Sequence, residues 1–70
     1  MAATFAPATR RAIAQYGEAV CRQAHDWHTR LGYGARGIAQ EMSGLIRTTR
    51  QADAAVNAGR EMYEKVMMGE

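Results

Sequence analysis

Residues 32–60 read GYGARGIAQEMSGLIRTTRQADAAVNAGR, and the predicted fold depends mainly on the pattern of turns and helices in this stretch. A glycine-flanked turn at residues 32–34 opens this stretch, and apolar residues at helical spacing predict a short helix over residues 35–42. The pair at residues 43–44, Ser-Gly, favours a second turn, which ends this helix. A longer segment with helical periodicity follows. The stretch therefore predicts a short helix and a long helix joined by a turn.

Residues 7–31 are expected to form one long helix. Pro7 suits the first turn of a helix, where its missing N–H has no partner to lose. Apolar residues then recur every three or four positions, which places them on one helical face. They are Ile13, Tyr16, Val20, Ala24, Trp27 and Leu31. Glycine readily adopts the left-handed conformation that closes a helix, so this one is expected to end at Gly32.

The third predicted helix runs from residue 48 to the C-terminus. Thr48 fits the N-cap position, and Gln51 follows at the spacing of a capping box. Apolar spacing continues through Ala52, Ala55, Val56, Gly59, Met62, Tyr63, Val66 and Met67. Gly17 and Gly59 each lie on or beside an apolar helical face, where glycine costs roughly 1 kcal/mol relative to alanine. We therefore predict a close backbone crossing of the first and third helices at these glycines.

The composition predicts an all-α protein. A chain of 70 residues that is 47% hydrophobic and 23% charged is typical of one globular domain, and its Ala, Arg, Gln, Glu and Met content favours helix. We expect a flexible N-terminus at residues 1–6, followed by a compact three-helix domain over residues 7–70. The order of its helices is long, short, long. A core this small supplies only a few kcal/mol of net stability, which leaves a homodimer open.

Charge and cysteine content limit the compartment and the partners. The net charge is +2, and eight of the nine basic residues are arginine, whose planar fork of donors suits phosphate or carboxylate. Cys21 is the sole cysteine, so no internal disulfide can form and a reducing cytoplasm is expected. No segment has the roughly twenty apolar residues that span a bilayer, and the N-terminus lacks a signal-peptide pattern. No membrane partner is predicted.

The second half of the chain resembles helix-turn-helix DNA-binding proteins. Ile38, Ala39 and Met42 match the apolar positions of the first helix of that motif, and Gly44 lies in the turn, with Ser43 as one additional residue. In this family the second helix presents its first residues to the major groove of DNA. The resemblance thus implies a small non-enzymatic DNA-binding regulator, with contacts from Arg47, Thr48, Thr49 and Arg50, and from Arg36 on the preceding helix.

The alternative is a protein that blocks a host protein. In size and style the chain is similar to small early-region proteins of temperate phages and prophages, which include both DNA-binding regulators and inhibitors of host enzymes. Aromatic and methionine side chains are favoured at interfaces, so a helical face could dock an inhibitor or adaptor on its target. The candidate interface residues are Trp27, Tyr33, Tyr63, Met67 and Met68.

Neither an enzyme nor a metal or cofactor site is predicted. Cys21, His25 and His28 share a helical face and are zinc-binding residue types, but structural zinc sites have four ligands and the chain has no further Cys or His. We interpret these three residues as part of a polar stripe on a helical face that borders the core. Cys21 one turn from His25 could form an activated thiolate. Three short helices, however, rarely enclose the concave pocket that catalysis needs.

Overall fold

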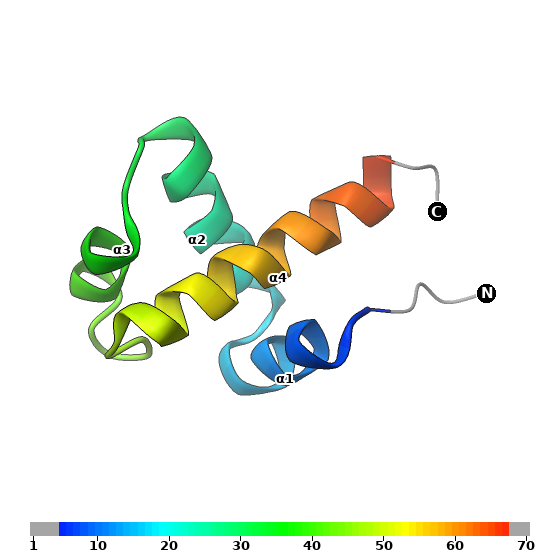
Figure 1. Ribbon diagram of the computed structural model, residues 1–70, viewed down its shortest axis with the longest axis horizontal. Helices are drawn as coiled ribbons and strands as arrows, with labels where there is room; N and C mark the ends of the chain where they lie inside the picture. The colour runs from blue at the N-terminus through cyan, green and yellow to red at the C-terminus, as the bar shows by residue number, and fades with distance from the viewer. Residues whose placement is uncertain (1–4, 68–70) are drawn as a thin grey trace.

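The computed structural model describes residues 5–67, with side chains described for residues 5–65. It is all-α, as the composition predicts: residues 5–67 contain four helices and no strand (Figure 1). The helices are α1 (Pro7–Tyr16), α2 (Glu18–Arg30), α3 (Ala35–Glu41) and α4 (Thr49–Met67). Helices α1, α2 and α3 all pack against α4, which is the central element of the fold.

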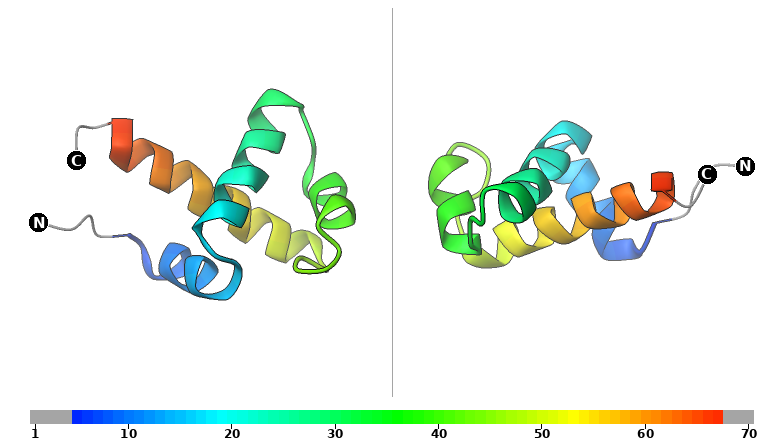
Figure 2. Two further views of the ribbon diagram at one scale, coloured as in Figure 1. Left: turned by 180° about the vertical axis from the view of Figure 1, so that it is seen from behind. Right: turned by 90° about the horizontal axis from the view of Figure 1, so that it is seen from above.

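The prediction of three helices was wrong, because the expected long first helix breaks at Gly17 into α1 and α2. Gly17 has φ 91° and ψ 155°, a backbone conformation that is essentially restricted to glycine. Its N–H donates to the carbonyl of Ile13 and closes α1, while its own carbonyl accepts from the N–H of Cys21 at the start of α2. The break changes the direction of the chain, so α1 and α2 pack on different parts of α4 (Figure 2).

Helices α2 and α4 cross with their backbones in contact at Gly59. A Cβ atom added to Gly59 would overlap the carbonyl oxygen of Cys21 and lie 2.7 Å from the Cβ of His25. The side chains around the crossing are small and fully buried; they are Cys21, Ala24, Ala55 and Ala58. The predicted close approach is thus confirmed at Gly59. It was wrong for Gly17, where an added Cβ would meet nothing within 4 Å.

Helix α3 and the connection after it close the core beside the first half of α4. Ile38 of α3 and Ile46 of the connection are both fully buried. Gly32 has φ 73° and follows the end of α2, which confirms the predicted stop. Helix α3 confirms the predicted bounds of the short helix to within one residue, and α4 confirms the predicted start of the final helix to within one residue. The predicted end of the final helix at the C-terminus lies outside the described residues.

Helix α1 is attached to α4 through Glu61. Both carboxylate oxygens of Glu61 lie 3.3 Å from the N–H of Ala6, the residue that precedes α1. Of the expected flexible segment 1–6, residues 1–4 lie outside the described part of the chain, and Phe5 packs against the core. The side chain of Thr9 and the N–H of Ala6 favour the charged carboxylate, so the pKa of Glu61 lies below its ordinary value.

None of the described helices combines the length and the apolar character that crossing a bilayer requires. The surface of α4 explains this for the longest of them. Its exposed stripe carries charged and polar side chains along the whole helix, at Arg50, Asp53, Asn57, Arg60 and Glu64. Only the opposite face is apolar, and it is covered by the other three helices.

Replacing Gly59 by alanine should destabilise the fold by about 2 kcal/mol or more, because the new methyl group meets backbone atoms that cannot rotate away. Alanine also favours the helix by about 1 kcal/mol relative to glycine, so the measured loss of stability is smaller than the cost of the steric clash itself. The free energy of unfolding in urea measures it. Gly37→Ala is the control, since its Cβ would lie 3.8 Å from Tyr33, an ordinary contact. A Gly59→Ala protein as stable as the parent would contradict the crossing.

The contact of Glu61 with α1 should make stability depend on pH. Because the folded-state pKa of Glu61 is lowered, its contribution is present above the unfolded-state pKa and is lost as pH falls through the folded-state pKa. Glu61→Gln should therefore lower the melting temperature at roughly pH 6, and the difference from the parent should shrink toward roughly pH 3. The control is Glu64→Gln, which changes an exposed glutamate three residues further along α4. A constant difference at all pH values would refute this role.

Candidate nucleic-acid interface

The first turn of α4 is held by two side-chain hydrogen bonds. The Thr48 hydroxyl accepts from the N–H of Gln51 at 3.1 Å, and the Gln51 amide oxygen accepts from the N–H of Arg47 at 2.8 Å. Thr48 and Gln51 each satisfy a free N–H at the helix start, as their spacing predicts. In a standard capping box the second bond goes to the N–H of the N-cap residue, which here would be Thr48. In this protein it goes to the N–H of Arg47, so it fixes the backbone of the residue before the cap. These two bonds therefore link the residue before the cap to the first turn of α4.

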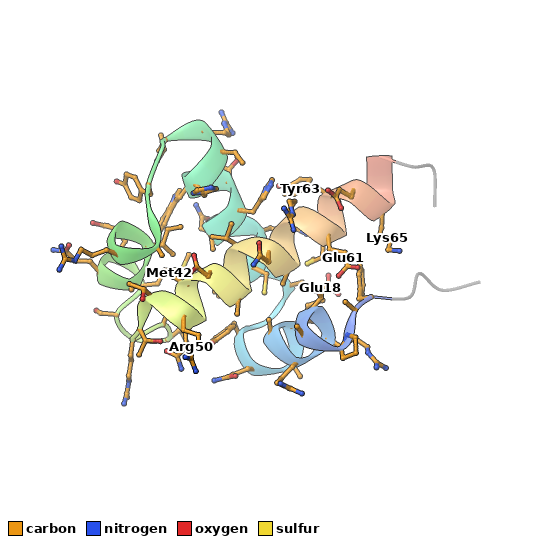
Figure 3. The ribbon with its side chains drawn as sticks, viewed as in Figure 1. Glu18, Met42, Arg50, Glu61, Tyr63 and Lys65 are labelled. Atoms are coloured by element: carbon orange, nitrogen blue, oxygen red, sulfur yellow. The ribbon has the colours of Figure 1, made fainter. Side chains whose placement is uncertain are left out.

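Two of the predicted DNA-contacting arginines lie together at this helix start. Arg47 and Arg50 are exposed, and within residues 5–65 neither has a carboxylate within 4.0 Å (Figure 3 labels Arg50). Thr48 and Thr49 between them are exposed as well. The first turn of α4 contains no acidic residue. We name residues 47–50 the α4 tip.

The arginines of α2 differ from those of the α4 tip. Arg22 lies 3.3 Å from the carboxylate of Glu18, and Arg30 lies 3.5 Å from that of Asp26, each pair one helical turn apart. These four side chains neutralise one another along the exposed face of α2. The positive charge of the α4 tip has no such partner among the described residues.

Arg36, the fifth predicted contact residue, lies on α3 and is exposed. The connection from α3 to α4 spans residues 42–48. Its first part continues the turn of α3, with the N–H groups of Leu45 and Ile46 both donating to the carbonyl of Met42. A helix-turn-helix joins its two helices by three or four residues. The order of elements is that of the motif, and the connection is longer.

The candidate protein-interface residues are distributed over several environments. Trp27 and Tyr33 are half-buried against the core, with ring centroids 5.8 Å apart. Tyr63 is 40% exposed and its ring lies 4.9 Å from that of His25. The Met67 side chain and all of Met68 lie outside the described part of the chain. The described candidates therefore belong to two ring pairs, Trp27 with Tyr33 and Tyr63 with His25.

Cys21, His25 and His28 do not converge on a common point. Cys21 is fully buried, and burial together with the nearby Glu18 carboxylate raises the pKa of its thiol, which opposes thiolate chemistry. His28 is exposed, and its Nδ1 lies 2.8 Å from the carbonyl oxygen of Tyr33. Over the described residues, no group of three or more Cys, His, Asp or Glu side chains is placed to hold a metal ion.

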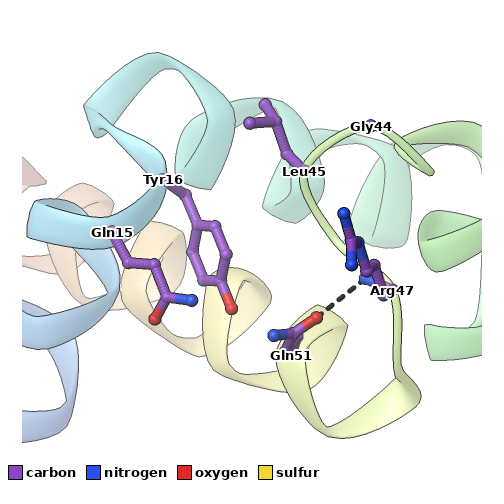
Figure 4. Close-up of a pocket in the computed structure, with 6 residues that line it drawn as sticks. All are labelled: Gln15, Tyr16, Gly44, Leu45, Arg47 and Gln51. Carbon is purple, nitrogen blue, oxygen red and sulfur yellow. Dashed lines mark hydrogen bonds between the residues drawn. The ribbon is translucent and has the colours of Figure 1, made fainter.

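A hollow of about 350 Å³ beside the α4 tip was missed by the sequence interpretation (Figure 4). It is lined by the end of α1, the α3–α4 connection and the start of α4, through Gln15, Tyr16, Gly44, Leu45, Arg47 and Gln51. The break at Gly17 lets α1 turn back along α4. The continuous first helix that the sequence predicted would not bring the end of α1 to this position, so the prediction contained no hollow. A glycine inside an otherwise helical pattern was the available signal.

Thr48→Ala should destabilise the protein by about 1 kcal/mol, because the N–H of Gln51 loses the hydroxyl that caps it. Urea denaturation followed by circular dichroism measures the change. Thr49→Ala removes a neighbouring exposed hydroxyl that caps no N–H and should stay within about 0.5 kcal/mol of the parent. Equal losses in the two variants would show that Thr48 does not cap α4.

Comparison with known protein families, with curated proteins and with solved structures finds no match for this chain. The functional proposal therefore rests on the geometry and charge of the α4 tip and of the hollow beside it.

Proposed function

We propose that this protein binds DNA through the α4 tip, in the order of elements of a helix-turn-helix and without enzymatic activity. Arg47 and Arg50 contact backbone phosphates, and the hydroxyl of Thr49 adds a neutral donor. Arg36 provides a flanking contact from α3. The single observation that carries the proposal is that these arginines are exposed and have no carboxylate partner within residues 5–65, whereas Arg22 and Arg30 are paired with carboxylates.

The helix start favours an anion for a second reason. The first N–H groups of a helix have no intrahelical acceptor, and the helix dipole adds partial positive charge at this end. Phosphate binding at helix N-termini uses both effects. Here the cap occupies the N–H of Gln51, while the N–H groups of Thr49 and Arg50 precede it in the same turn. Phosphate oxygens at the α4 tip would therefore meet guanidinium and backbone donors together.

The charge pattern of α4 limits the contact to its beginning. Along the exposed stripe, Arg50 is followed by Asp53, and Arg60 by Glu64. Insertion of the full length of α4 into a groove would bring these carboxylates close to phosphates. The proposed contact is therefore made by the first turn and is dominated by phosphate binding, which positions a protein on DNA without specifying sequence.

Binding to a labelled DNA duplex, measured by fluorescence anisotropy over a range of salt concentrations, tests the proposal. Affinity should fall as salt rises, because each neutralised phosphate releases counterions and contributes about 0.9 to the slope of log K against log salt. Arg47→Ala with Arg50→Ala should weaken binding and reduce the magnitude of that slope by about 2.

The matched control is the double variant Arg22→Ala with Arg30→Ala, which changes the net charge by the same amount at arginines that already have carboxylate partners. It should keep a salt dependence close to that of the parent. Equal losses in both double variants would indicate a nonspecific effect of net charge. No salt-dependent binding by the parent would refute the proposal outright.

A further inference from the structure

The hollow beside the α4 tip is open to solvent and combines polar and apolar walls. Gln15 and Tyr16 come from the last turn of α1, Arg47 comes from the connection just before α4, and Gln51 comes from the first turn of α4. Leu45, which is 53% exposed, forms part of the rim. None of the described residues that line the hollow carries a carboxylate. In Figure 4 the polar ends of Gln15, Tyr16 and Gln51 are directed toward the same space.

These polar groups retain hydrogen-bonding capacity. The Gln51 amide oxygen accepts from the N–H of Arg47, which leaves its NH₂ group free to donate. Within residues 5–65, no side-chain hydrogen bond uses the Gln15 amide or the Tyr16 hydroxyl. An amide donates and accepts at once, and a phenol does the same. The hollow therefore offers hydrogen-bond donors and hydrogen-bond acceptors next to the guanidinium of Arg47.

We propose that the hollow binds one unpaired nucleotide of the nucleic acid held by the α4 tip, an inference that rests on the proposed function. The phosphate lies against Arg47. The base lies over Leu45, with its polar edge toward the amides of Gln15 and Gln51. Glutamine amides pair well with the donor and acceptor groups of a base edge. The bound base would also cover apolar surface that Leu45 exposes to water.

The size and lining of the hollow favour a nucleotide over a phosphate ion. About 350 Å³ is at the lower end of the range of small-molecule sites, and polar side chains provide most of the described lining. A phosphate ion would use Arg47 and leave Leu45 and the Gln15 amide without a partner. A base within a duplex is stacked and paired, so an unpaired nucleotide is the form that can enter.

The test is titration of the ¹⁵N-labelled full chain with deoxynucleoside 5′-monophosphates, and separately with deoxyribose 5-phosphate, followed by NMR. The monophosphates should shift the side-chain NH₂ signals of Gln15 and Gln51 at lower concentration than the sugar phosphate. Gln15→Ala should weaken binding of a monophosphate and of a single-stranded oligonucleotide by about twofold to tenfold, the effect of losing one hydrogen-bonding group. Gln40→Ala, an exposed glutamine on α3 outside the hollow, is the control.

Two results would overturn the inference: equal shifts with the sugar phosphate and the monophosphates, or equal affinities of the Gln15→Ala and Gln40→Ala proteins for the single strand. A duplex of the same sequence separates this failure from that of the proposed function. If the protein binds the duplex in a salt-dependent way and Gln15→Ala does not change this binding, the proposed function of the α4 tip is supported. That conclusion does not depend on whether the hollow binds a nucleotide. Monophosphate binding without any duplex binding would refute the proposed function and support the nucleotide site alone.

Discussion

The contact between the Gly59 backbone and the carbonyl of Cys21 determines how the helices of this protein are arranged. Two helices can approach this closely only where side chains are absent or small, and Gly59 is flanked by Ala55 and Ala58 on the buried face of α4. The approach brings α2 across α4 and excludes water from Cys21 and Ala24. Because the core consists largely of alanine and a few larger side chains, its stability depends on this close backbone packing.

The same arrangement determines which part of α4 is left exposed. Helix α2 crosses α4 at Gly59, and α1 lies along it from Gln51 to Glu61, with its own start held by that carboxylate. Helix α3 packs beside the first half of α4. The three helices cover one face of α4 and leave its first turn exposed at the end of the molecule. The arginines there have no carboxylate neighbours in the described chain, so their charge is available to an anionic partner.

Much of the fold could be predicted from local signals, and the site only in part. Gly32 and the Thr48–Gln51 spacing mark helix ends that depend on nearby backbone groups, and both are confirmed. The break at Gly17 could not be predicted from periodicity, because Tyr16 and Val20 keep helical spacing across it. Without that break, α1 has no reason to turn back along α4. The exposed tip was therefore predicted, while the contribution of Gln15 and Tyr16 to the adjacent hollow was not.

Nuclear Overhauser effects at Gly59 test most directly whether the helices cross as described. The structure predicts strong cross-peaks between the Hα protons of Gly59 and the Hβ protons of His25, since a Cβ in place of one Hα would lie 2.7 Å from the His25 Cβ. If those cross-peaks are absent while α2 and α4 remain helical, the two helices do not meet at Gly59. The arrangement that leaves the first turn of α4 exposed would then be wrong.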